Sequence, residues 1–150
     1  MILEQPGFEQ RVRDSFARQE AMTTLGARLG AIAAGRVEVL LAHRAELTQQ
    51  HGFLHAGIVA TALDTACGYA AFTLMPDDAA VLTIEFKVNL LAPARGPRFR
   101  FEGVVVKPGR TISVVDGSAW QADGDGADGK LVATMTATVM TVRGRAALHH

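Results

Sequence analysis

The 150-residue chain is 49% hydrophobic and 20% charged, and its 15 basic and 15 acidic side chains give a formal net charge of zero. This composition predicts a single globular domain over residues 1–150, with no overall attraction to nucleic acid or to a membrane surface. The single cysteine excludes an intrachain disulfide and a cysteine metal cluster. Because no apolar leader follows Met1, a cytoplasmic location is expected.

The first third of the chain predicts a helix, two strands and a loop. Apolar side chains recur at roughly helical spacing between charged ones in Phe8–Thr23, which indicates an amphipathic helix at about residues 7–23. The rest of the fold is expected at about residues 24–143. The strands and the loop that follow the helix are placed at Leu25–Ala34, Arg36–Ala42 and Glu46–Leu54.

A long apolar segment, AGIVATALDTACGYAAFTLM at Ala56–Met75, contains a single ionisable carboxylate, Asp64. A membrane span is rejected, because a carboxylate at the bilayer centre costs about 2.5–3.5 kcal/mol and the surrounding alanine, glycine and threonine offset little of it. The segment is instead typical of a helix buried in a globular protein. On a helical wheel, Asp64 shares its face with small side chains at positions 57, 60, 61, 67, 68 and 71.

After Pro76 the period of the pattern changes from helical to two. Alternating apolar and polar side chains in Ala80–Leu91 predict a half-buried strand. Three more strands are expected at Arg98–Val106, Thr111–Ala122 and Lys130–Val142, the last two joined by the loop Asp123–Gly129. Four strands in hairpins imply an antiparallel sheet, whose apolar face only the long helix can cover. The expected class is therefore α+β, with the hotdog architecture of a curved antiparallel sheet around one central helix, plus an N-terminal helix.

The isolated carboxylate is the strongest candidate for chemistry. A buried, ionised aspartate without a cation is unfavourable, so Asp64 is either satisfied by a hydroxyl or amide in the core or used as a general base or nucleophile in a cleft. The helix opens at His55-Ala56-Gly57, and its first-turn N–H groups point a partial positive charge outward. They are suited to stabilise an oxyanion in acyl transfer. Alternatively, His55 is only a capping or loop residue.

Three segments together resemble the PaaI-like hotdog acyl-CoA thioesterases over about residues 20–142. They are HGFLHAGIVATALD at His51–Asp64, TIEFKVNLLAPARG at Thr83–Gly96 and KPGRT at Lys107–Thr111. The resemblance implies a site formed at a dimer interface, with Gln49, His55 and Ala56 from one subunit and Asp64 and Thr83 from the other.

By this resemblance, Asp64 acts as general base on water or as nucleophile on the thioester. Gln49 binds near the carbonyl or the water, and Thr83 hydrogen-bonds the water. The backbone N–H of Ala56 polarises the carbonyl, and His55 flanks it. Ala56 stands where the family usually has glycine, so its role requires an ordinary helical conformation at this residue.

The coenzyme A part of the substrate needs groups that bind phosphates. Arginine suits phosphate geometry, and several basic residues follow one another across two turns of the predicted sheet. An ordinary solvated hairpin is the alternative for each of them. The candidates for binding the substrate or coenzyme A are Gly57, Arg95, Lys107, Gly109, Arg110 and Thr111.

These observations predict a thioester hydrolase that acts on a small aromatic or medium-chain acyl-CoA by carboxylate-assisted attack of water. No cofactor and no metal are expected, coenzyme A being part of the substrate. The expected partners are the acyl-CoA and further copies of this chain, as a dimer or a dimer of dimers, without nucleic acid or membrane. A non-catalytic acyl-CoA binder or sensor and, less favoured, a hotdog hydratase or dehydratase stay open as alternatives.

Overall fold

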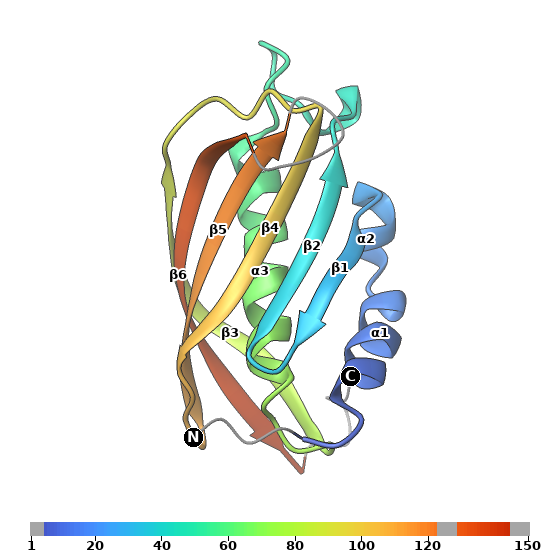
Figure 1. The fold of residues 1–150 in the computed structure, drawn as a ribbon, viewed down its shortest axis with the longest axis vertical. Coiled ribbons are helices and arrows are strands. Elements are labelled where there is room, and N and C mark those ends of the chain that lie inside the picture. Colours follow the sequence, from blue (N-terminus) through green and yellow to red (C-terminus); the bar gives the residue numbers. More distant parts are fainter. Residues whose placement is uncertain (1–4, 123–128, 145–150) are drawn as a thin grey trace.

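A curved antiparallel sheet wraps around one central helix in the computed structural model, which describes residues 5–122 and 129–144 (Figure 1). The sheet has six strands in the order β1-β2-β4-β5-β6-β3. The strands are β1 (Arg28–Ala33), β2 (Arg36–Ala42), β3 (Ala79–Leu90), β4 (Arg98–Lys107), β5 (Ile112–Ala122) and β6 (Lys130–Arg143). The helices are α1 (Phe8–Arg18), α2 (Glu20–Leu25), the one-turn 3-10 helix η1 (Ala45–Leu47) and α3 (Ala56–Phe72). The hotdog architecture is thereby confirmed.

Helix α3 supplies the centre of the core because it packs against every strand from β2 to β6. Two glycines of the sheet allow this close approach. A Cβ at Gly103 would collide with the backbone of Ala66 and Cys67, and one at Gly117 would press on the Cys67 sulfur. The sheet therefore sits almost directly on the helix backbone, and α3 is fixed in position relative to the strands.

The predicted N-terminal helix is two helices, because the chain breaks at Gln19. Gln19 has an extended backbone, with φ −84° and ψ 97°, and separates α1 from α2. In one continuous helix, Leu25 would lie on nearly the opposite face from Val12. The break lets both side chains be buried. The single helix predicted over residues 8–23 was wrong in this respect.

The strand predicted at residues 80–91 exists as β3, but the prediction that it is half-buried was wrong for the isolated chain. Leu82, Ile84 and Phe86 are between 44% and 52% exposed. β3 also pairs with β6 and not with the next strand in sequence, so it forms a free edge of the sheet with a bulge between Thr83 and Glu85. The four C-terminal strands are thus not a simple run of hairpins.

The remaining predicted elements agree with the structure to within a few residues. Helix α3 ends at Phe72, three residues earlier than predicted, and the Thr73 hydroxyl donates to the Ala70 carbonyl and accepts from the Gly35 N–H, each at 2.7 Å. The predicted loop at 46–54 overlaps η1 and contains a β-bridge between Thr48 and Leu54. Of the loop predicted at 123–129, residues 123–128 lie outside the described part of the chain.

Candidate active site

Asp64 lies where the middle of α3 meets the free edge strand β3. The Thr83 hydroxyl on β3 donates a hydrogen bond of 2.7 Å to Asp64 Oδ1. Asp64 is half-buried, and it lines a cavity of about 120 Å³ together with Thr83. No ion pair to Asp64 is found within residues 5–122 and 129–144. One carboxylate oxygen is therefore fixed by a hydroxyl while the group still faces an open cavity.

The surroundings of Asp64 make it a better proton acceptor than an ordinary aspartate. Burial raises the pKa of the Asp64 carboxyl, and the hydrogen bond from Thr83 opposes part of this effect. Burial acts by removing water from the charged form, whereas the hydroxyl stabilises that form. A carboxylate with a raised pKa beside a cavity is the arrangement that general-base catalysis requires.

The N-terminus of α3 presents a second candidate group, the backbone N–H of Ala56. His55 caps the helix, because its Nδ1 accepts a hydrogen bond of 2.8 Å from the Gly57 N–H. The Ala56 N–H has no hydrogen-bond partner in the part of the chain that is described, and Ala56 has a negative φ. Its methyl group is therefore compatible with an ordinary helical start, and its N–H is available to an oxyanion.

Gln49 sits in the loop before α3 with its side chain held by that loop. Its Oε1 accepts hydrogen bonds from the backbone N–H groups of His51 and Phe53. Since the oxygen is occupied by these donors, the Nε2 amide group is left to donate to another molecule. Gln49 and Ala56 both line a cavity of about 420 Å³ that extends over Phe53 and the segment Leu90–Ala94.

The site residues predicted from the sequence thus fall into two groups along one protomer. Gln49 and Ala56 share the larger cavity, and His55 adjoins them, whereas Asp64 and Thr83 share the smaller one. Ala56 and Asp64 are eight residues apart on one helix, a distance of about 12 Å along its axis. One thioester carbonyl cannot contact both groups of the same protomer.

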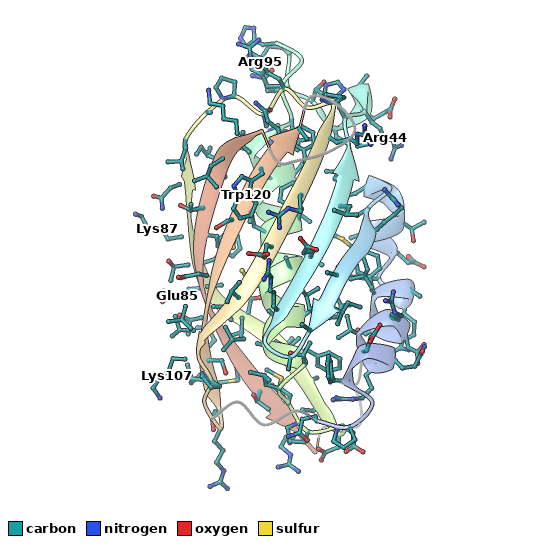
Figure 2. The ribbon with its side chains drawn as sticks, in the orientation of Figure 1. Arg44, Glu85, Lys87, Arg95, Lys107 and Trp120 are labelled. Atoms are coloured by element: carbon teal, nitrogen blue, oxygen red, sulfur yellow. The ribbon has the colours of Figure 1, made fainter. Side chains whose placement is uncertain are left out.

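The residues predicted to bind coenzyme A also lie far apart within the protomer. The basic residues that follow one another in the sequence therefore do not form one cluster in a single chain. Arg95 lies at one end of the molecule, where its guanidinium is 4.9 Å from the centre of the Phe53 ring, and Lys107 lies toward the other end (Figure 2). Gly109, Arg110 and Thr111 line a cavity of about 390 Å³ beside Met75 and Pro76, past the C-terminal end of α3. Another basic residue of this stretch serves the fold: Arg100 pairs with Glu38 and Glu102.

Sequence reasoning missed several residues that border the Asp64 cavity, among them Gln19 and Tyr69. The Tyr69 hydroxyl is hydrogen-bonded to Ser15 Oγ at 2.9 Å and accepts from Gln19 Nε2 at 3.1 Å. Tyr69 is the only tyrosine of the chain and lies on its most apolar helix, which was an available signal. Gln19 carried no such signal, because its place depends on the break between α1 and α2.

Cys67, which the helical wheel places on the face of Asp64, is not among the residues that line the Asp64 cavity. It is fully buried on the core side of α3, beneath Gly117. Burial raises the pKa of the Cys67 thiol to about 12, with smaller contributions from the charges of Asp64 and Asp116. The thiol is therefore protonated at neutral pH and serves as a small core side chain.

Known proteins resemble this chain in sequence and in fold. The family model described as "Thioesterase superfamily" matches residues 51–127. A crystal structure of a thioesterase family protein from Silicibacter pomeroyi is 59% identical, covers 92% of this chain and 100% of its own, and superposes with a TM-score of 0.88. The E. coli PaaI protein, at 18% identity, covers 91% of this chain and 94% of its own with a TM-score of 0.81, a likeness of fold alone.

Curated relatives from archaea extend this similarity. Two proteins named "Putative esterase" from Saccharolobus solfataricus are 38% identical over 60% of this chain and 30% identical over 75% of it. The matched part of this chain spans 64% of the first relative and 74% of the second. None of the helices described here is both long and apolar enough to cross a membrane.

Proposed function

This chain belongs to the thioesterase superfamily, and from that premise we propose that it is an acyl-CoA thioesterase in which Asp64 activates the attacking water. The observation that carries the proposal is the half-buried Asp64 carboxyl, whose pKa is raised by burial and which Thr83 holds at the mouth of a cavity. An aspartate that served only the core would have its charge paired or its oxygens enclosed. Asp64 instead faces open space.

The proposed reaction needs three groups around the thioester carbonyl. Asp64 accepts a proton from water as the water oxygen bonds to the carbonyl carbon. The Ala56 N–H, at the positive end of α3, stabilises the oxyanion that forms, and the Gln49 amide donates to the carbonyl or orients the water. When the intermediate collapses, the C–S bond breaks and coenzyme A leaves as a thiolate that recovers the proton from Asp64. Direct nucleophilic attack by Asp64 is the alternative within this proposal.

The active site is proposed to form between two copies of the chain. One protomer's Ala56 and Asp64 are too far apart to act on one carbonyl, so the partner must supply one of the two groups. The exposed apolar side chains that a partner would cover lie on β3 and directly after it: Leu82, Ile84, Phe86, Leu90 and Leu91. A two-fold axis at this free edge would continue the sheet and bring Ala56 of one copy toward Asp64 of the other.

The same symmetry would bring the two groups of proposed coenzyme A contacts together. In an antiparallel arrangement of two protomers, the end that carries Arg95 lies beside the partner's opposite end. Lys107 lies toward that opposite end (Figure 2), and Gly109, Arg110 and Thr111 are in the turn that directly follows it, between β4 and β5. We propose that phosphate groups of the coenzyme bind between them. A cytoplasmic location stays a prediction.

The test of this function is hydrolysis of acyl-CoAs by the purified protein, followed chromatographically through loss of thioester and appearance of coenzyme A and the free acid. Turnover of at least one small aromatic or aliphatic acyl-CoA is the expected result. Tight binding of acyl-CoAs without turnover would contradict catalysis and leave a binding protein.

The hydrogen bond between Thr83 and Asp64 predicts a specific pH dependence. Because Asp64 must be ionised to accept a proton, kcat/KM is expected to rise with pH through the raised pKa of Asp64. Thr83→Val removes a hydrogen bond that lowers this pKa, so the rising limb of the profile should move to higher pH. Profiles of kcat/KM against pH for both proteins check this. A rising limb at the same pH in both would show that Thr83 does not tune the catalytic base.

A further inference from the structure

We propose that Gly68 and Gln19, which both border the cavity beside Asp64, set the size of the acyl group that the protein accepts. This inference rests on the proposed thioesterase activity and narrows its substrates to acyl groups no larger than a single ring or a short chain. Both residues line the same cavity as Asp64 and Thr83.

The charges of the two cavities indicate which of them receives the acyl group. The larger cavity has no charged side chain among the described residues that line it, but one of these residues, Phe53, stacks against the Arg95 guanidinium, so a cation suited to the phosphates of coenzyme A lies beside it. The smaller cavity is lined by no basic side chain of the described residues and contains a carboxylate. Its lining residues are Gln19, Asp64, Thr65, Gly68, Tyr69, Val81 and Thr83. An anionic coenzyme is disfavoured there, whereas a neutral acyl group is not.

The volume of the smaller cavity limits what it can hold. It measures about 120 Å³, somewhat less than a cavity of about 150 Å³ that accommodates a benzene molecule in another protein. We therefore expect this partly open space to accept an acyl group about as large as a single ring in preference to a long straight chain. The walls are fixed, because Tyr69 and Thr65 are buried residues of the core helix.

Gly68 leaves this space open at a position where the fold does not require glycine. It lies one helical turn after Asp64, so a side chain there would stand about 5–6 Å from the aspartate Cβ. A Cβ built on Gly68 meets no atom within 4 Å. Glycine inside a helix is less stable than alanine by roughly 0.5–1 kcal/mol. The packing of this chain therefore does not explain the glycine, and a molecule in the cavity does.

Among the described residues that line the cavity, Gln19, at the break between α1 and α2, is the one that lies outside α3 and β3. Its Nε2 donates to the Tyr69 hydroxyl at 3.1 Å, which holds the side chain across the space beside Gly68. Its Oε1 has no partner in the part of the chain that is described. Shortening this side chain should lengthen the cavity without touching Asp64.

The experiment measures kcat/KM for straight-chain acyl-CoAs from acetyl to decanoyl, together with benzoyl-CoA and phenylacetyl-CoA. Gly68→Val is expected to lower kcat/KM for the largest group that the wild type accepts by roughly 10–200-fold, the range for a change of one methylene in a binding pocket, and to lower it much less for acetyl-CoA. Gln19→Ala should act in the opposite direction and raise kcat/KM for the next longer chain. Ala17→Val, on the exposed side of α1, is the matched control and should leave the profile unchanged.

A Gln19→Met variant tests whether Gln19 acts through the bulk of its side chain. Light scattering on Gly68→Val tests whether the space beside Gly68 is left empty by the partner subunit. Gln19→Met keeps the length of the side chain but not its hydrogen bond, so it should retain the wild-type size limit if Gln19 acts as a wall. The inference would be overturned if Gly68→Val kept the wild-type size limit or lost the same fraction of kcat/KM for every substrate. It would also be overturned if light scattering showed that the Gly68→Val oligomer dissociates, because the partner subunit would then occupy the space beside Gly68. A wild type that hydrolyses no acyl-CoA would overturn the proposed function itself.

Discussion

Asp64→Asn is expected to lower kcat for acyl-CoA hydrolysis by at least about 100-fold, because general bases contribute roughly 10²–10⁴-fold. The amide cannot accept a proton from water, yet its oxygen can still accept the Thr83 hydrogen bond that measures 2.7 Å in the wild type. The site should therefore keep its shape while losing its base. The measurement is steady-state kinetics on whichever acyl-CoA the wild type turns over fastest.

The stability of this variant provides a control with a definite sign. The pKa of Asp64 is raised by burial, so the folded protein binds its proton more tightly than the unfolded chain does. Between the ordinary and the raised pKa, the free energy of unfolding consequently falls as pH rises. At neutral pH, Asp64→Asn should be at least as stable as the wild type in urea unfolding. An active Asp64→Asn protein would exclude Asp64 as the base, and an unfolded one would show that the carboxylate serves the fold.

Phe86→Asp is expected to produce monomers that have lost nearly all activity, although Asp64 and Thr83 are unchanged. Phe86 is 44% exposed on the free edge strand β3, among the apolar side chains that the partner is proposed to cover. Covering a large apolar side chain stabilises the dimer by about 1.5–3 kcal/mol. An aspartate at this position would instead repel the same aspartate of the partner across the two-fold axis. Light scattering with an activity assay on the same sample checks both effects.

Val106→Asp is the matched control for this experiment. Val106 is 58% exposed on β4, so the same charge is introduced on an apolar side chain of another strand. Its activity and dimer mass should equal those of the wild type. A fully active monomer of Phe86→Asp would show that one protomer holds the complete site.

The central helix and its carboxylate could be predicted because they depend on local properties of the chain. Twenty residues with one charge cannot face water and do not suit a membrane, which leaves only a buried helix. An unpaired carboxylate in such a helix indicates function whatever the surrounding fold. The helix N-terminus at Ala56 was predictable for the same reason, since His55 and Gly57 mark where it begins.

The environment of β3 could not be predicted from its alternating pattern. Alternation indicates that one face of a strand is covered, but not whether the cover comes from the same chain or from another copy. In this protein Leu82, Ile84 and Phe86 are left largely uncovered by their own chain. The pairing of β3 with β6 depends on a connection around the end of the sheet, for which the sequence contains no local signal.

The walls of the Asp64 cavity and the placement of the basic residues were unpredictable for a related reason. Gln19 approaches Tyr69 from 50 positions away, at a break between two helices that each bury an apolar side. Arg95 and Arg110 are close in sequence, yet strand β4 lies between them and carries the chain from one end of the molecule toward the other (Figure 1). Sequence proximity therefore suggested a cluster that a single chain does not form.

The measurement that tests a shared hydrolytic site most directly mixes two inactive variants, Asp64→Asn and Gln49→Ala, under conditions that exchange subunits. If each site takes Asp64 from one protomer and Gln49 from the other, a mixed dimer has one intact site. An equal mixture should then recover about one quarter of the wild-type activity, because half of the dimers are mixed. Asp64→Asn mixed with Thr83→Ala should show no more than the average activity of the two unmixed variants, because these two residues lie in the same half-site and no mixed dimer gains an intact site. No recovery in the first mixture would contradict thioester hydrolysis at a site shared between two subunits.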